Sequence, residues 1–411
     1  MRLPEPSPLA TPCDHPTTQR FDLSGSFVHA EAVTILITGA TGFVGSRLAH
    51  ALLTTRNERV IALGRGDLAD VRRRVVAAVS LHGGTDADAL RRLQCVKGDV
   101  TLPWLGLSPG THARLAEQVD AVWHCAGDIA LAGERERLFL VNAHGTAQVL
   151  AFADRTRPGC RLVHVSTMAV AGNRPAGLVR EDDLTDAHGF VTHYDASKYE
   201  AEQLVRAWTA RRGRPAVVLR PGVVAGDRPL PETAAGHPLA LLGRMIETVA
   251  SGGAPGIPSV AERSAGAQLH LRLKASPSAT FNIVPSDYAT AAMVRIGHDT
   301  PHEHAGAHTY HIVHHTPTQL VDVIGAFEQA YPGLRLECTE EIDDATPAER
   351  FIATHLTGFL SYCRLRHTFD RTGALAATPG LPEPAPLDTG FLRQALGLSS
   401  RAVVDSAAGA L

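Results

Sequence analysis

The sequence predicts an α/β fold in which helices cover both faces of a doubly wound parallel sheet. Near its start, the apolar run Val33–Ile37 leads directly into a glycine-rich turn, and from Ser46 onward apolar residues return at helical spacing. Short apolar runs then alternate with helical patterns, which is the order of a parallel sheet with right-handed crossovers. The length of 411 residues accommodates this sheet and a second lobe.

The turn after the first strand, Thr38–Gly45, has the glycine pattern of a Rossmann-type dinucleotide site. Gly39 permits a tight bend, Gly42 lets the backbone approach a pyrophosphate, and Gly45 lets helix and strand pack closely. The start of the following helix offers unpaired N–H groups and the positive end of its dipole to the phosphates. We therefore expect the cofactor to contact Gly39, Thr41, Gly42, Phe43, Val44 and Gly45.

The second expected strand, Arg59–Leu63, ends in a residue that predicts which dinucleotide binds. An acidic residue there would bind the ribose hydroxyls of NAD, whereas Arg65 favours the 2′-phosphate of NADPH. Arg73 or Arg74 in the following helix could add a second contact, and we assign it to Arg74. The alternative, that these two arginines lie solvated on an exposed helix face, stays open.

Two further strands end in residues suited to line the cofactor groove. The strand Leu93–Val96 leads to Asp99, whose carboxylate can accept the adenine amino group, and to Val100, whose N–H faces the ring. The strand Asp120–His124 ends in small residues that leave room for a dinucleotide, because ligands in such sheets lie at the carboxyl ends of the strands. These small residues are Ala126 and Gly127.

Three residues have the spacing of a proton-transfer site. The expected strand Arg161–Val165 delivers Thr167 at its carboxyl end, and a later helix places Tyr194 and Lys198 one above the other. The ammonium of Lys198 and the positive nicotinamide ring both favour tyrosinate, which predicts a lowered pKa for Tyr194. The Thr167 hydroxyl would hold the same carbonyl oxygen. Asn142 lies at the start of another helix. Its side chain either caps or braces that helix, or it braces the water network of Lys198 and so belongs to the cofactor site.

Together, the motifs TGATGFVG, GDV, WHCAG, VNAHGT, VSTMAV, YDASK and LRPGVVAGD resemble those of the extended short-chain dehydrogenase/reductase superfamily. The chain is more similar to the thioester reductase and fatty acyl-CoA reductase branch, with its male-sterility-type NAD-binding domain, because of Arg65, VHVSTMAV, SKYEAE and FNIVPSDYATAAMV. The resemblance covers roughly residues 33–330. It implies that Thr167 and Tyr194 hold the substrate oxygen and that Lys198 contacts the ribose and the tyrosine. It also implies that the nicotinamide is flanked by Pro221, Gly222 and Val223.

The resemblance predicts an NADPH-dependent reductase that converts an acyl thioester, bound to a carrier protein or to CoA, into an aldehyde or alcohol. No carrier or adenylation domain is recognisable in the sequence, so we expect the substrate to arrive in trans, with an acyl or peptidyl carrier protein as a partner. The alternative is an NADP-dependent ketone or hydroxyl oxidoreductase for a small natural-product or steroid-like substrate. A non-catalytic NADP(H)-binding protein is the third interpretation.

The expected domains follow from these motifs. Residues 1–30 form a loosely ordered tail, and residues 31–226 form the NADP-binding domain, to which residues 279–300 return. Residues 227–278 and 301–411 form a smaller, mostly helical substrate-binding lobe.

Composition excludes several classes of function. With 39 basic and 42 acidic residues, the chain has no excess charge that would bind nucleic acid. It lacks a run of eighteen apolar residues, so no membrane span is expected, and the six scattered cysteines fit a reducing cytoplasm. The histidine-rich segment 298–315 contains no recognisable ligand set and precedes a strand-like TYHIV, so we expect a polar surface loop there and no metal site.

Overall fold

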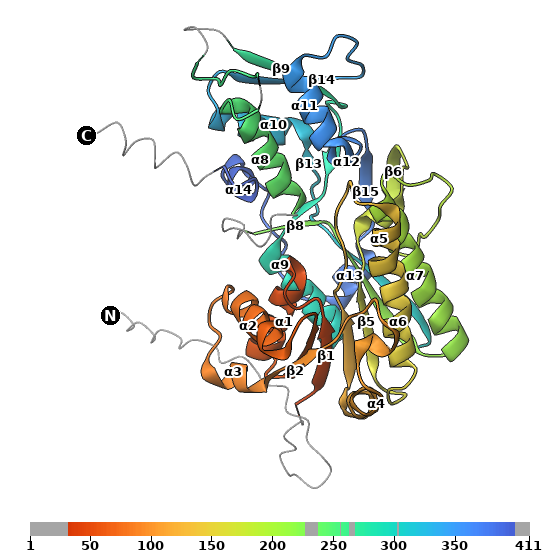
Figure 1. Cartoon of the computed structure of the whole chain (residues 1–411). Coiled ribbons are helices and arrows are strands. Elements are labelled where there is room, and N and C mark those ends of the chain that lie inside the picture. Colours follow the sequence, from red (N-terminus) through yellow and green to blue (C-terminus); the bar gives the residue numbers. More distant parts are fainter. Residues whose placement is uncertain (1–31, 227–236, 255, 263–267, 302–303, 399–411) are drawn as a thin grey trace, which may run out of the picture.

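The computed structural model describes residues 32–226, 237–254, 256–262, 268–301 and 304–398, so the expected N-terminal tail and part of the segment 227–278 lie outside the described residues. A seven-stranded sheet and the helices that cover it form the larger part of the molecule (Figure 1). All paired strands of this sheet run parallel. The order along the sheet is β12 (Gly306–Ile312), β7 (Pro215–Pro221), β5 (Arg161–Val165), β4 (Ala121–His124), β1 (Thr34–Thr38), β2 (Arg59–Gly64) and β3 (Leu93–Lys97).

This order confirms the predicted doubly wound fold. From β1 the chain goes outward through β2 and β3, and then returns to β4 on the other side of β1. A crevice for a ligand opens where the strand order reverses in this way, at the carboxyl ends of β1 and β4. The glycine-rich turn leaves β1 at this point and leads into helix α1 (Phe43–Thr55).

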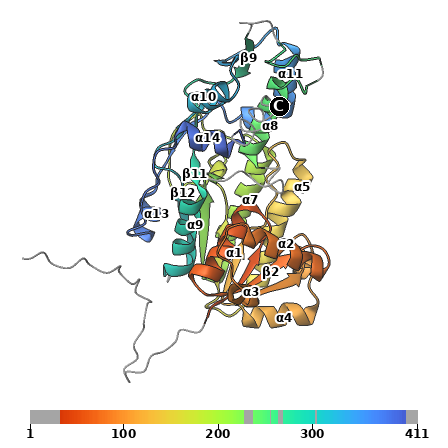
Figure 2. The ribbon, with the colours of Figure 1, turned by 90° about the vertical axis from the view of Figure 1, so that its left-hand side faces the viewer.

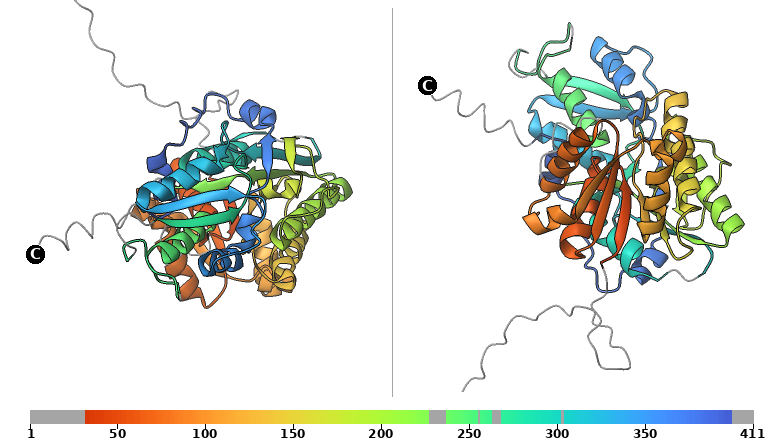
Figure 3. Two further views of the ribbon diagram at one scale, coloured as in Figure 1. Left: turned by 90° about the horizontal axis from the view of Figure 1, so that it is seen from above. Right: turned by 60° about the horizontal axis from the view of Figure 1, so that its bottom comes forward.

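Helices cover both faces of the sheet because side chains alternate along each strand (Figure 3). Ile35 and Ile37 of β1 belong to a buried cluster with helices α1, α2 (Leu68–Ser80) and α9 (Ser286–Val294). Leu36 belongs to the cluster on the opposite face, with helices α4 (Pro109–Gln118), α6 (Gly145–Ala153) and α7 (His193–Arg212). The two faces together bury the sheet.

A second lobe packs beyond one end of the sheet, as the turned view in Figure 2 shows. Its own core joins apolar side chains of several helices to those of a parallel strand pair, β9 (Leu269–Lys274) and β14 (Leu334–Thr339). The lobe therefore holds strands as well as helices. Its helices are α8 (Pro238–Ala250), α10 (Leu320–Ala330), α11 (Pro347–His355), α12 (Thr357–Leu360) and α14 (Thr389–Ala395).

Three short strand pairs connect the two parts. The strand β8 (Val223–Ala225) pairs with β11 (Ile283–Pro285), which is the expected return of the chain to the nucleotide-binding part. The strand β10 (Thr280–Phe281) pairs with β13 (Thr318–Gln319). The strand β6 (Ala176–Val179) pairs with β15 (Arg366–Phe369), which brings a late segment beside the sheet domain and leads to α13 (Thr372–Ala377).

The histidine-rich segment departs from the sequence prediction. We expected residues 298–315 to form a surface loop that precedes a strand-like TYHIV, and residues 301–411 to belong to the second lobe. Instead, Gly306–Ile312 form β12, which begins before that run and is the edge strand beside β7. The physical reason is that these residues match the strand register of β7, and His311 is buried with its Nδ1 2.8 Å from the carbonyl oxygen of Asp370. Among the described residues, no cluster of metal-ligating side chains occurs and no helix is long and apolar enough to cross a membrane.

Candidate active site

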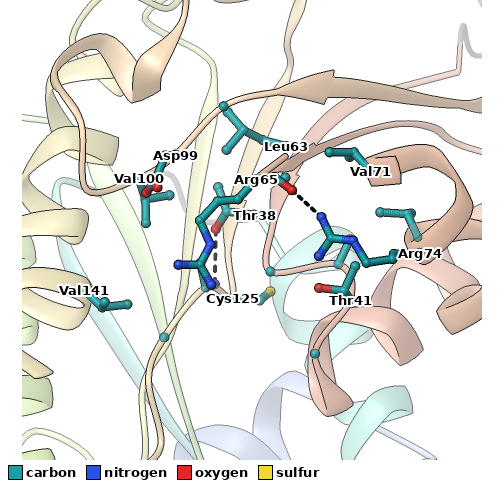
Figure 4. A pocket seen from close by; sticks show the side chains of 18 of the residues that line it. Thr38, Thr41, Leu63, Arg65, Val71, Arg74, Asp99, Val100, Cys125 and Val141 are labelled. Atoms are coloured by element: carbon teal, nitrogen blue, oxygen red, sulfur yellow. Dashed lines mark hydrogen bonds between the residues drawn. The ribbon is translucent and has the colours of Figure 1, made fainter. Parts of the chain in front are cut away.

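A cavity of about 200 Å³ opens at the carboxyl ends of β1, β2, β3 and β4 (Figure 4). It is the crevice expected from the strand order. The sequence-predicted residues that line it are Gly39, Thr41, Gly42, Arg65, Arg74, Asp99, Val100, Ala126 and Gly127.

The turn between β1 and α1 is so tight that a side chain at Gly39 or Gly45 would collide with the backbone. Gly39 has φ +75°, and a Cβ on it would lie 2.6 Å from the backbone nitrogen of Ala126. A Cβ on Gly45 would lie 2.2 Å from the carbonyl oxygen of Gly39. Gly42 is the N-cap of α1 and supplies no side-chain cap, so the first N–H groups of the helix face the turn. The cavity therefore fits a phosphate-bearing dinucleotide.

Two arginines, Arg65 and Arg74, line this cavity. The Arg65 side chain extends across the cavity, and the Arg74 side chain lies on the side of the cavity opposite to the Arg65 guanidinium (Figure 4). Arg74 is held there, because its Nε lies 2.8 Å from Asp70 and its Nη2 donates to the carbonyl oxygen of Arg65. Arg73 pairs with Asp70 and does not line the cavity.

Asn142 lies behind the groove, on a π-helical turn (Leu140–His144). Its buried side chain accepts a hydrogen bond from Asp128 N at 2.8 Å and donates to Asp128 O at 2.9 Å. It also donates to the Ser197 hydroxyl on α7 at 2.9 Å. Asn142 lines neither cavity described here, so it braces the loop after β4 against α7.

A second cavity, of about 460 Å³, continues from the first and contains the predicted proton-transfer residues. Thr167 follows the end of β5 and Tyr194 lies in the first turn of α7, and both side chains line this cavity. The Lys198 ammonium, one turn later, donates to the carbonyl oxygen of Val165 at 2.9 Å. The other predicted residues that line this cavity are Gly42, Phe43, Val44, Gly45, Gly127, Pro221, Gly222 and Val223.

The pKa of Tyr194 departs from the sequence prediction. Burial raises it above the usual value for a phenol, and the charge of Asp195 adds to that effect, while the hydrogen bond with Thr167 opposes it. Burial also lowers the pKa of Lys198 to about 8, although the Glu202 carboxylate opposes this shift. For the protein groups alone, the prediction of a lowered Tyr194 pKa is wrong, because burial is the largest influence on this pKa. Tyr194 therefore keeps its proton at neutral pH.

A buried ion pair between Arg220 and Glu202 lies beside the segment that carries Thr167. Arg220 and Glu202 are fully buried, and Arg220 Nη2 lies 2.8 Å from Glu202 Oε2. The Ser166 hydroxyl, adjacent to Thr167, donates to Glu202 Oε1 at 2.5 Å. Burial opposes ionisation of Glu202, but the Arg220 guanidinium outweighs it and keeps the pKa low. Both residues lie in quoted motifs, yet only the fold brings them together.

Sequence reasoning missed Tyr362, which lines the second cavity from the second lobe. Its hydroxyl donates to Asp195 and lies 3.2 Å from the Thr192 hydroxyl. Thr192 and Asp195 form the capping box of α7, the helix that carries Tyr194. No local pattern could have revealed this contact, because 167 residues separate Tyr362 from Asp195.

Much of the remaining lining of the second cavity is apolar, although His237, Thr280, Asn282 and His367 also contribute to it. Phe281 of β10 and Phe359 of α12 stack with ring centroids 5.2 Å apart, and both belong to the core of the second lobe. Gly358 allows α12 to approach the loop after β4, since a Cβ on it would lie 2.8 Å from Cβ of Leu131. The apolar lining away from the glycine turn comprises Ile129, Leu131, Met168, Phe281, Phe359, Leu365 and Phe369.

Several known proteins are similar to this chain in sequence or in architecture. A family model described as male sterility protein, of the NAD-binding type, matches residues 37–293. One of the linear gramicidin synthase proteins of Brevibacillus parabrevis is 28% identical over 311 residues, which are 74% of this chain and 6% of that protein. The L-2-aminoadipate reductase large subunit from Penicillium chrysogenum is 31% identical over 213 residues, 47% of this chain and 15% of that protein.

Among solved structures, the terminal R domain from the myxalamid PKS-NRPS biosynthetic pathway is 25% identical, with a TM-score of 0.70. The match covers 92% of this chain and 93% of that one. The chain therefore matches the R domain over nearly its full length, whereas it spans only a small part of the synthase and reductase relatives.

Proposed function

The chain belongs to the male sterility protein family of NAD-binding domains, and we propose that it is an NADPH-dependent reductase of acyl thioesters that yields an aldehyde or alcohol. The observation that carries the proposal is the position of Thr167 and Tyr194. They line one cavity, which has the dinucleotide groove on one side and an apolar wall on the other. A thioester carbonyl placed there would meet both a hydride donor and a proton donor.

The residues of the chain would hold the dinucleotide as follows. The N–H groups at the start of α1 and the bare backbone of Gly42 would hold the pyrophosphate. Pro221, Gly222 and Val223 would flank the nicotinamide, and Lys198 would reach the ribose. When bound, the reduced nicotinamide supplies a hydride to the carbonyl carbon.

Thr167 and Tyr194 act on the carbonyl oxygen. Their hydroxyls stabilise the negative charge that develops there, and Tyr194 transfers its proton to the oxygen. The raised pKa of Tyr194 suits this role, because a proton donor must be protonated before the reaction begins. Cleavage of the C–S bond of the resulting hemithioacetal then releases the thiol and leaves the aldehyde. Lys198, which is positively charged near neutral pH, favours the tyrosinate that remains.

Arg65 and Arg74 support NADPH over NADH within this proposal. Both side chains line the cavity at the end of β2, where the adenosine ribose of a dinucleotide is expected. A fixed positive charge there favours the 2′-phosphate, which only NADPH carries.

We place the reaction in the cytoplasm. The thioester would arrive on an acyl or peptidyl carrier protein acting in trans, or on CoA. The relatives support a carrier-bound substrate, since one of them is part of the linear gramicidin synthase. The chain matches the R domain of a PKS-NRPS pathway along most of its length. Such a relationship favours a tethered acyl substrate.

A panel of substrates tests the proposal. Purified protein is mixed with NADPH, and the loss of reduced-nicotinamide absorbance is followed with acyl-CoA, acylated carrier protein, aldehydes and ketones. The proposal predicts oxidation with the thioesters, and much slower oxidation by the Tyr194→Phe variant. Turnover of ketones alone would instead identify an NADP-dependent ketone reductase. Equal traces for the wild type and for Tyr194→Phe with every substrate would indicate a protein that binds NADP(H) without catalysis.

A further inference from the structure

We propose that the second cavity takes an uncharged, apolar acyl chain and excludes acyl groups that carry a cationic or anionic substituent. This inference rests on the proposed thioester reduction and adds the class of acyl group. It is carried by the side chains that form the cavity wall opposite the glycine turn.

The wall is assembled from segments far apart in sequence. Ile129 and Leu131 come from the loop after β4 and Met168 follows Thr167, whereas Phe281, Phe359 and Phe369 come from β10, α12 and β15. The stacked pair of Phe281 and Phe359 is continuous with the core of the second lobe. Apolar surface of this kind binds methylene groups and aromatic rings by removing both from water.

The part of the lining that the structure describes offers a charged acyl group no counter-charge beyond the catalytic Lys198. Among the described residues that line the cavity there is no aspartate or glutamate. Burial lowers the pKa of His237 to about 4 and also lowers that of His367, so both imidazoles are neutral at pH 7. The remaining cation is Lys198, whose ammonium is bonded to the carbonyl oxygen of Val165 and belongs to the catalytic set.

Asp195 does not supply the missing charge, although it follows Tyr194 directly in sequence. One carboxylate oxygen accepts from the Tyr362 hydroxyl and the other accepts from Thr192 N at 3.3 Å. The side chain is fully buried and is absent from the cavity lining. A charged acyl group would therefore lose hydration at this wall without gaining an ionic partner from the described lining, which is unfavourable.

The test compares three thioesters of equal chain length. N-acetylcysteamine thioesters of octanoate, of octanoate with a terminal trimethylammonium group, and of octanedioate are reduced with saturating NADPH, and kcat/KM is measured for each. We expect the uncharged octanoyl thioester to be preferred over both charged ones by about 100-fold or more, since an unpaired buried charge costs several kcal/mol.

Variants place a charge on the wall. Ile129→Asp adds a carboxylate at a cavity position that is 43% exposed and so tolerates a polar side chain. It should shift the ratio of kcat/KM values towards the trimethylammonium substrate by about tenfold, which corresponds to one ion pair of about 1.4 kcal/mol. The matched control is Leu375→Asp on α13, which is 45% exposed and lines neither cavity described here. The control should leave the ratio unchanged.

The outcomes separate this inference from the proposed function. If all three thioesters are reduced with similar kcat/KM values, or if a charged one is preferred, the inference is overturned while thioester reduction stands. If Ile129→Asp changes the ratio no more than Leu375→Asp does, the assignment of this wall to the acyl chain is wrong. If no thioester is reduced but ketones are, the proposed function fails and the inference fails with it.

Discussion

The hydroxyl of Tyr362 donates a hydrogen bond to the carboxylate of Asp195, so a residue of the second lobe holds the first turn of helix α7. Tyr194 lies on that same turn. Burial raises the pKa of Asp195 to about 7, and the hydrogen bond from Tyr362 opposes this rise. The position of the proposed proton donor is thus coupled to the packing of the second lobe.

Removal of this hydrogen bond should slow the reaction more than it weakens substrate binding. Tyr362→Phe keeps the ring in the cavity wall but leaves a buried carboxylate oxygen without its donor, and we expect kcat to fall about tenfold with a smaller change in KM. The acid limb of the kcat profile should also move to higher pH, because the hydrogen bond that lowers the Asp195 pKa is gone. Steady-state kinetics from about pH 5 to pH 9 measure both effects.

The control for that variant is Tyr288→Phe, which removes a hydroxyl bonded to Arg371 outside both cavities described here. An unchanged kcat and pH profile in Tyr362→Phe would mean that the contact with Asp195 does not position Tyr194.

Arg65 should determine the preference for NADPH. Arg65→Asp replaces the proposed 2′-phosphate partner with a repelling charge, so the Kd for NADPH should rise at least about tenfold while the Kd for NADH changes little. Fluorescence titration of both dinucleotides measures the two constants. Arg73→Asp is the matched control, because Arg73 lies on the neighbouring helix outside this cavity. Equal losses for NADPH and NADH would remove the phosphate role.

The ion pair behind the active site should be important for stability. Glu202→Gln leaves the fully buried Arg220 without its counter-charge, and we expect a loss of about 3–5 kcal/mol in the free energy of unfolding. The double variant Glu202→Gln with Arg220→Met removes both charges and should recover part of that loss. Urea unfolding of the three proteins provides the comparison. A loss below about 1 kcal/mol in the single variant would show that the buried charges do not depend on each other.

Stability should also depend on the protonation of His298. Burial opposes its charge, but hydrogen bonds and the charges of Asp299 and Glu58 outweigh burial and raise the pKa to about 9. Because the folded-state pKa lies above the unfolded value of about 6.5, this contribution is fully present below that value and is lost as pH rises through about 9. We expect a decrease of roughly 1–3 kcal/mol in the free energy of unfolding across that interval.

Chemical unfolding at several pH values measures this effect. His298→Asn should remove the decrease, whereas His355→Asn, which changes an exposed histidine bonded to a backbone carbonyl, should retain it. A wild-type decrease that persists in His298→Asn would assign the pH dependence to another group.

The parts of the site that were predictable from sequence are those encoded locally. The glycine turn, the strand-end residue Arg65 and the helical spacing of Tyr194 and Lys198 each lie within one short segment, and the structure places them in two adjoining cavities. Asn142 was assigned to the cofactor side, but its side chain bonds to Asp128 and Ser197 instead. Its place behind the groove depends on a loop from another strand.

Other features depend on long-range packing and could not be predicted. The apolar wall and Tyr362 come from segments that meet only when the second lobe folds over the sheet. The run TYHIV is strand-like in the sequence, but the histidines around it favoured a polar loop, although β12 begins at Gly306 and His311 is buried in the sheet. For the protein groups alone, the pKa of Tyr194 is raised and not lowered, since the extent of its burial cannot be obtained from the spacing to Lys198.

The most direct test of the central claim follows the hydride and the proton donor together. NADPH deuterated at the transferable position is incubated with an octanoyl thioester, and the product is analysed by mass spectrometry for the wild type and for Tyr194→Phe. The account predicts deuterium on the former carbonyl carbon of the aldehyde or alcohol, with formation slowed about 100-fold or more in Tyr194→Phe although NADPH still binds. An unlabelled product, or equal rates for the two proteins, would contradict it.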